Sequence, residues 1–248
     1  MVLAVDTRAD FEQGTSSTSW PDTGTWEVTY GAGANYAVVL LGREGTPATV
    51  TVQLGGVTMT ELAAAFLNTS TSVIMAFYIL AADLPAGGTA RAITISDSAN
   101  AAGGAIKFYA FTGASQEAPL AATPQGGTNV QTVTVTKSDC TVGSVLLAQF
   151  TQNRSTSQSQ NTSGAALDST SGTWDNQGQH FVSAGGQYEY FGDRVATSTT
   201  HDAISVNVDG SGASRRHSVG IIEILAGVAS VGAVIVSPSR RYKHLLVR

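Results

Sequence analysis

Hydrophobic and polar residues alternate with a period of two through most of this chain, in short runs separated by glycine and proline. The most apolar run, VIMAFYIL at residues 73–80, is rich in β-branched and aromatic side chains, and its only polar group is the Tyr78 hydroxyl. The run is too short to span a membrane, so it predicts a strand that is buried on both faces. Such a strand needs further sheet packed against it, and the pattern therefore predicts a β-sandwich.

Turn residues follow this run directly. A proline and two glycines at residues 85–88 reverse the chain, which resumes at residues 90–95 with Ile93 and Ile95 on one face. Two strands separated by such a turn commonly pair with each other. We therefore expect a central β-hairpin, followed by a polar loop at residues 96–104.

Other short runs with the same period predict the remaining strands, and no segment has the pattern of a convincing amphipathic helix. These further strands are expected at residues 25–30, 36–42, 47–56, 57–63, 105–111, 130–136, 144–150, 180–183, 187–191, 203–208 and 218–225. The total of roughly twelve strands predicts an all-β protein, a jelly-roll-like β-sandwich with extended N- and C-terminal arms.

The pattern also predicts how the chain is divided. The expected parts are an N-terminal arm with an incoming strand at residues 1–30, a β-sandwich body at 31–226 and a basic C-terminal arm at 227–248. Prolines and glycines at residues 116–128 mark either a long crossover or a boundary between two halves of the body. AIKFYAFTG at 105–113 and VGIIEILAG at 219–227 echo each other faintly, but any β-sandwich closes its strands in this way.

The longest polar stretch, residues 151–179, consists mostly of Ser, Thr, Asn, Gln and Gly. Leu167 and Trp174 are its only large apolar side chains. This composition buries too little apolar surface to offset the entropy that ordering costs. We therefore expect a surface excursion that lies outside the core.

Charge is scarce and unevenly distributed. Charged residues make up 12% of the chain, which is about half the usual share of a globular protein. All 18 acidic residues lie at or before Glu223, so the body is acidic and the segment after it is purely basic. Domains that bind nucleic acid concentrate Lys and Arg against phosphates, so this acidic body argues against a nucleic-acid partner.

The cysteine content and the N-terminus indicate where the protein folds. Cys140 is the only cysteine, which excludes an intramolecular disulfide and a cysteine-based zinc site. Asp6 and Asp10 interrupt the N-terminal residues, which have neither the basic nor the apolar segment of a secretion signal. We expect folding in a reducing compartment and no membrane span.

No pattern of residues indicates an enzyme, a metal site or a cofactor. The chain has no P-loop, dinucleotide fingerprint or nucleophile elbow, and its four histidines lack ligand spacing, so we expect them at the surface. His201 and Asp202 are adjacent and point to opposite faces of a strand, which is poor geometry for an acid–base pair. A glycosidase pair would need two carboxylates about 5 to 9.5 Å apart, chosen from Asp168, Asp175, Glu189, Asp193 and Asp202. Solvated loop acids are the simpler interpretation.

Aromatic side chains suggest one candidate binding site. Trp174, Tyr188 and Tyr190 surround the polar stretch and would form a platform for the ring of a glycan. The alternative is that Tyr188 and Tyr190, which share one predicted strand, pack the core or its edge.

The C-terminal arm is the candidate partner-binding segment. Val234 and Val236 would add a strand to a neighbour's sheet edge, with backbone hydrogen bonds supplying the affinity. The basic and apolar groups that would contact an acidic partner surface are Arg240, Arg241, Tyr242, Lys243, Leu245, Leu246 and Arg248. The alternative is that the arm folds back onto its own acidic body as a final strand.

Three segments carry a resemblance to known proteins: ATVTVQLGGVTMTELA, FYILAADLPAGGTARAITIS and GGAIKFYAF. In their order and turn residues they resemble a β-sandwich module of tailed-bacteriophage virion proteins and of prophage-encoded bacterial proteins. The resemblance covers residues 36–118, about a third of the chain, and its motifs are features of turns and core, so no functional residue is carried over.

This resemblance implies a non-enzymatic virion protein, such as a capsid decoration protein, a head fibre or a tail component. Its partners would be other capsid or tail subunits and further copies of itself, and it would assemble in the host cytoplasm. The main alternative is a carbohydrate-binding or adhesin module that binds a host-surface glycan.

Overall fold

The structure is a computed structural model that describes residues 2–14, 17–45, 49–69, 72–101, 103–128, 130, 132–153, 167–168, 172–182, 187–206 and 216–227. These residues form 21 strands and one short 3-10 helix at Ala63–Ala65, which confirms the prediction of an all-β sandwich. No helix in this described part has the length and apolar character that crossing a membrane requires.

The N-terminal half of the chain forms two sheets. Its inner sheet contains β1 (Ala4–Gln13), β11 (Gly104–Thr112), β4 (Tyr36–Glu44) and β9 (Ser72–Leu80) in that order, with β7 (Thr60–Glu61) and β8 (Leu67–Asn68) on the far side of β9. Its outer sheet contains β2 (Ser17–Trp20) and β3 (Trp26–Val28) beside β10 (Arg91–Ala101), followed by β5 (Val50–Leu54) and β6 (Val57–Thr58).

The C-terminal half repeats this arrangement. Its inner sheet contains β12 (Leu120–Ala121) and β13 (Gln125–Thr128) beside β21 (Arg216–Ile224), followed by β15 (Val145–Asn153), β19 (Gln187–Val195) and β18 (Asp175–Val182). The other described strands are the outer pair β14 (Thr132–Lys137) and β20 (His201–Val206) and the ribbon of β16 (Leu167–Asp168) and β17 (Gly172–Thr173).

The two halves share one strand order. In each inner sheet the first strand of the half lies beside its last strand: β1 beside β11, and β12 beside β21. The next two strands are β4 and β9 in the N-terminal half, and β15 and β19 in the C-terminal half. In each half the strand before the last, β10 or β20, belongs to the outer sheet. The two segments that echo each other in sequence, 105–113 and 219–227, therefore occupy equivalent places.

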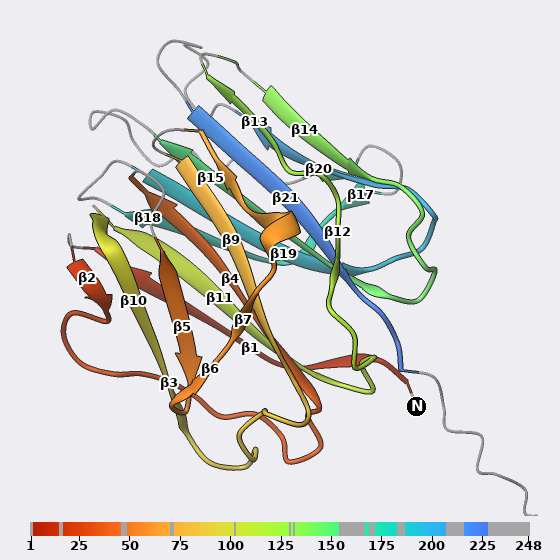
Figure 1. Cartoon of the computed structure of the whole chain (residues 1–248). Coiled ribbons are helices and arrows are strands. Elements are labelled where there is room, and N and C mark those ends of the chain that lie inside the picture. The colour runs from red at the N-terminus through yellow and green to blue at the C-terminus, as the bar shows by residue number, and fades with distance from the viewer. Residues whose placement is uncertain are drawn as a thin grey trace, which may run out of the picture.

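The four sheets stack as four layers, with the two inner sheets face to face in the middle (Figure 1). Three apolar clusters fill the spaces between successive layers. In the first, Ile93 of the outer sheet packs with Phe77 of β9. In the second, Ala76 of β9 packs in one cluster with Leu147 of β15. Because β9 lies in an inner layer, the prediction that residues 73–80 are buried on both faces is confirmed.

The predicted central hairpin is wrong. β9 pairs with β4, whereas β10 pairs with β5 in the other sheet, so the turn at residues 85–88 connects two layers. β10 also extends to Ala101, through residues expected to form a loop. A turn in the sequence marks where a strand ends, but it does not decide whether the next strand stays in the same sheet.

A true hairpin lies at Gly55 and Gly56, between β5 and β6. Leu54 pairs with Val57 across this two-residue turn, and the glycines have φ values of 56° and 82°. A turn with positive φ at both positions matches the twist of paired strands and favours glycine. The Gly-Gly motif is therefore explained by its backbone geometry.

Two polar segments contribute more to the sheets than expected. The N-terminal arm contains β1, a ten-residue edge strand that pairs with β11. The stretch 151–179, expected outside the core, includes the end of β15 and the start of β18, and its Trp174 is 1% exposed. Pairing with a neighbouring strand satisfies the backbone of polar residues, so strands form there without a strong hydrophobic pattern.

Candidate functional site

Buried ion pairs join the layers of the stack. Arg43 of β4 contacts Asp97 of β10 with 2.8 Å between Nη1 and Oδ2, and both side chains are 1% exposed. At the other end of the stack, the Lys137 Nζ of β14 lies 3.0 Å from Glu223 Oε2 of β21. Burial raises the pKa of Glu223, but the hydrogen bond from the Thr141 backbone, the nearby Ser144 side chain and the Lys137 ammonium outweigh it and hold that pKa below its ordinary value. These charges are therefore engaged in structure.

A third pair joins the two halves. Arg8 of β1 donates two hydrogen bonds to the Asp193 carboxylate of β19, from Nε at 2.9 Å and from Nη2 at 2.7 Å. A bidentate pair of this kind fixes the orientation of both side chains. Asp193 was a candidate for a glycosidase pair, and its position in this contact gives it a structural role instead.

Glu189 is the most unusual of the candidate carboxylates, because it lies fully buried between the halves. Thr151 Oγ1 donates to Glu189 Oε1 at 2.6 Å, while Glu189 Oε2 has no hydrogen-bond partner among the described residues. A side chain at Gly42 would overlap this carboxylate, so β4 needs glycine there. Burial raises the pKa of Glu189 well above 4.5, the Thr151 hydrogen bond opposes this shift, and the Glu44 carboxylate raises the pKa further.

Hydroxyl groups continue this polar region of the interface. Ser72 Oγ donates to the Thr151 carbonyl at 2.9 Å, and Ser218 Oγ donates to the Ser72 carbonyl at 2.8 Å. These bonds connect β9 of the N-terminal half with β15 and β21 of the C-terminal half. The region is dense and polar, and its contacts fix how the two inner sheets lie on each other.

Among the described side chains, Glu189 forms a hydrogen bond with Thr151 and with none of the other candidate acids. Asp175 is exposed and lies opposite Asp193 in the pairing of β18 with β19. Asp202 lies on β20, where its carbonyl accepts a hydrogen bond from Trp174 Nε1 at 3.0 Å. The side chain of Asp168 lies outside the described residues.

The expectation of surface histidines is wrong for two of the four. His201 and His217 are both fully buried. His201 Nε2 lies 3.3 Å from the backbone nitrogen of Ser198 and 3.3 Å from its hydroxyl, which ties the turn before β20. Among the described residues no cluster of His, Cys, Asp or Glu has the composition of a metal site.

The predicted aromatic platform does not include Trp174 or Tyr190. Their exposed fractions are 1% and 4%, and the Tyr190 ring stacks on Phe150 with centroids 4.8 Å apart. Trp174 packs in the same cluster, between the inner and outer sheets of the C-terminal half. Both are core residues, as the packing alternative expects, and the side chain of Tyr188 lies outside the described residues.

The predicted partner-binding arm also lies outside the described residues, so its role stays a prediction from the sequence. Its residues are Val234, Val236, Arg240, Arg241, Tyr242, Lys243, Leu245, Leu246 and Arg248. The described chain ends with Ala226 bridged to Ala114 and with the Gly227 backbone nitrogen donating to the Gly113 carbonyl at 2.7 Å.

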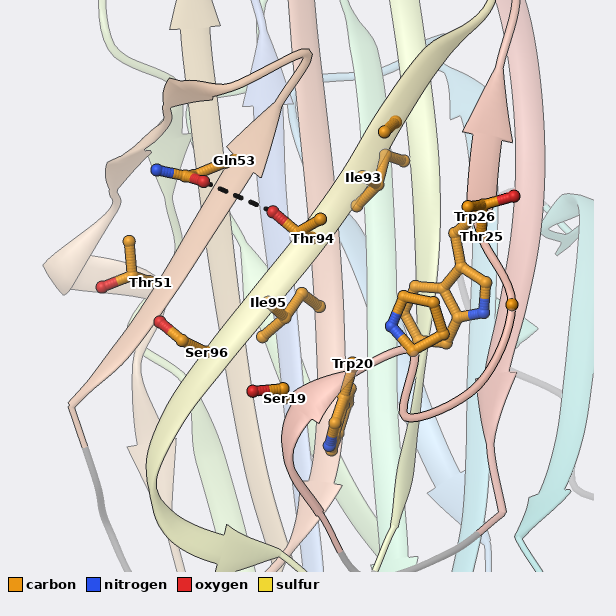
Figure 2. A pocket seen from close by; sticks show the side chains of 13 residues that line it. Ser19, Trp20, Thr25, Trp26, Thr51, Gln53, Ile93, Thr94, Ile95 and Ser96 are labelled. Carbon is orange, nitrogen blue, oxygen red and sulfur yellow. Dashed lines mark hydrogen bonds between the residues drawn. The ribbon is translucent and has the colours of Figure 1, made fainter.

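A hollow of about 380 Å³ lies on the outer sheet of the N-terminal half (Figure 2). β5 and β10 supply hydroxyl and amide groups to it, among them Thr94, whose hydroxyl donates to Gln53 Oε1 at 3.4 Å. Trp20 and Trp26 also line it, but their rings are only 2% and 8% exposed. The hollow is therefore uncharged and hydroxyl-rich, without an aromatic face on which a sugar ring could stack.

A larger groove, of about 690 Å³, lies at the edge of the C-terminal half. One wall is β12 and the turn after it, and the other is β14 with residues 138–139. Leu120 is 45% exposed at this groove. The groove lies between segments that are close in the chain, and no pattern in the sequence indicates it.

Searches with this chain against protein-family models, curated proteins and solved structures found no match.

Proposed function

We propose that this chain is a non-enzymatic structural protein of a virion, a capsid decoration protein or another head- or tail-associated component. The segments that resemble phage virion modules form β5 to β7 and the region from β9 to β11. Their Gly-Gly hairpin and their doubly buried strand are the backbone features on which the resemblance rests.

The observation that carries the proposal is the use of basic side chains in the body. Arg43 and Lys137 are buried in ion pairs between layers, Arg8 joins the halves, and Lys107 pairs with Asp10 on the neighbouring strand. Charges engaged in this way are withdrawn from binding or catalysis at the surface. The remaining surface is rich in hydroxyl groups and small side chains, which suits close packing against other protein subunits.

The C-terminal arm supplies the contact with a neighbour in this proposal. Val234 and Val236 add a strand to a sheet edge, and the basic groups from Arg240 to Arg248 contact the acidic surface of a capsid or tail subunit. The protein acts as a homo-oligomer in the virion after assembly in the host cytoplasm, with no cofactor.

Analysis of released particles tests the proposal. Particles from a lysed host that carries this gene are banded by density and analysed by mass spectrometry. The expected result is that the chain bands with the particles in a fixed ratio to the major capsid protein. Its recovery only in the particle-free soluble fraction contradicts the proposal. A chain that lacks residues 237–248 should stay folded and soluble but lose its place in the particle.

A carbohydrate-binding role is the competing proposal, and the uncharged hollow in Figure 2 is the observation that favours it. Its hydroxyl and amide groups match those of a neutral glycan. A glycan array separates the two proposals: selective binding that Gln53→Ala abolishes favours the carbohydrate role, and uniform background signal favours the structural one.

A further inference from the structure

β14 is an edge strand whose outer side has no strand partner among the described residues. It pairs with β20 on one side only, as the two strands form a sheet of their own. Thr132, Thr134 and Thr136 are exposed, and the residues between them point into the core. An edge of this kind presents unpaired backbone groups and accepts another strand readily.

The groove beside β14 gives such a strand room for its side chains. Its floor includes the buried Val135, and its opposite wall carries Leu120 and Ala121. An added strand would place alternate side chains against this apolar surface, while its backbone pairs with β14. The groove therefore fits an extended segment of alternating or small apolar residues.

The chain itself contains a segment of this chemistry. Residues 228–238 (VASVGAVIVSP) are small or β-branched up to the final Ser-Pro, and they follow directly after the last described residue, Gly227. Eleven extended residues span up to about 36 Å, whereas the six residues of β14 need about 20 Å. The segment is long enough to cover the edge and still lead to the basic residues that follow Pro238.

We propose that the edge of β14 and its groove receive residues 228–238 of a second copy of this chain as an added strand. The inference rests on the proposed structural role, and it identifies one partner of the arm and the surface that holds it. The result is a chain of copies, or a closed ring, in which each arm is held by the next body.

The direction of the chain end favours a second copy over the same chain. At its end the described chain continues in the direction of β21, since Ala226 is still bridged to Ala114 beyond β12. Leu120 of its own groove pairs with Glu223, so the chain has passed that groove by Gly227 and would have to reverse direction to return to it. The acidic excess of the body and the purely basic end of the arm favour docking of an arm on a body of this chain.

Crosslinking between two variants of the full chain, each with one added cysteine, tests this proposal. One variant carries Thr134→Cys in the groove and the other carries Ile235→Cys in the arm, and they are mixed with a short bis-maleimide. The native Cys140 is 3% exposed and stays in place. The expected product has twice the 25.5 kDa mass of one chain, and its linked peptide joins residues 134 and 235.

A matched control uses Thr94→Cys, an exposed threonine on the outer sheet of the other half. An excess of a peptide with the sequence of residues 228–238 should reduce the specific product several-fold. Equal crosslinking of Thr94→Cys and Thr134→Cys, or no product, overturns the proposal. A chain that carries both Thr134→Cys and Ile235→Cys provides a further check. If it yields only crosslinked monomer, the arm lies in its own groove, and the role of a second copy is overturned.

This test is independent of the particle analysis because it uses purified protein. If the specific crosslink forms but the protein is absent from particles, the docking of the arm on a second copy stands and the virion role is rejected. A protein found in particles without the crosslink would retain the virion role and reject β14 as the receiving edge.

Discussion

Replacing Glu189 with Gln should remove a specific pH dependence from the stability of the protein. Glu189 is fully buried between the halves, and this burial raises its pKa well above 4.5. The Glu44 carboxylate also raises the pKa, whereas the hydrogen bond from Thr151 lowers it. The raised pKa means that the folded protein keeps this proton at pH values at which the unfolded chain has lost it. The contribution of Glu189 to stability is therefore complete below pH 4.5 and is lost as the pH rises towards the folded pKa.

The magnitude follows from the difference of one bound proton. Within that window the free energy of unfolding of the wild-type protein falls by about 1.4 kcal/mol per pH unit through this group. The amide of Gln has nearly the same shape, and its oxygen can still accept the Thr151 hydrogen bond. The stability of Glu189→Gln relative to the wild type should therefore rise by about that amount per pH unit above pH 4.5, and then level off.

Urea unfolding at a series of pH values, followed by tryptophan fluorescence, measures this difference. Asp97, whose pKa is raised by burial, and Glu223, whose pKa is lowered, also change stability with pH, but they are common to both proteins and cancel in the comparison. Glu61→Gln removes an exposed carboxylate and controls for net charge. A constant difference between wild type and Glu189→Gln from pH 4 to pH 8 would refute the buried, protonated state of Glu189.

Three further predictions concern the body. Phe77→Ala should lower the free energy of unfolding by about 3 to 5 kcal/mol and Ile79→Ala by about 2 to 5 kcal/mol, because each leaves a cavity in the core. The exposed Thr94→Ala is the control in the same denaturation assay, and losses below about 1 kcal/mol for the two core variants would contradict the packing. Gly42→Ala should destabilise the protein because its methyl group overlaps the Glu189 carboxylate, and Glu189→Ala in the same chain should restore part of the loss; strictly additive effects in a double-mutant cycle would show that the two positions do not touch. Trypsin should cut the purified protein first at Arg154, which lies outside the described residues within the longest polar stretch; mass spectrometry of the first fragments checks this, and an earlier cut at Arg43 or Arg91 would contradict it.

The strands with strong patterns were predictable from sequence. Residues 36–42, 73–80 and 105–111 are apolar on both faces, and they form β4, β9 and β11 of an inner sheet with layers on both sides. β1 was missed because its side chains give little apolar contrast: Ala9 and Phe11 face one core, whereas Arg8 and Asp10 form ion pairs on the other side. Its position depends on pairing with β11, a residue-by-residue match that a single segment does not reveal.

The candidate sites were less predictable than the strands. Trp174 lies in a polar stretch, where its sequence neighbours suggested exposure, yet it packs against strands far away in the chain. The burial of Glu189 likewise depends on Gly42, which contacts it from the other half. Sequence patterns report which face of a strand is apolar, but the layer that covers that face comes from the fold.

Electron cryo-microscopy of the purified particles tests the central proposal most directly. The structural role predicts density for a body of four stacked β-sheets at regular positions on the head or tail, with the C-terminal arm leading into a neighbouring subunit. Particles that contain the chain in no symmetric position, or a map in which all such density belongs to other proteins, would contradict it.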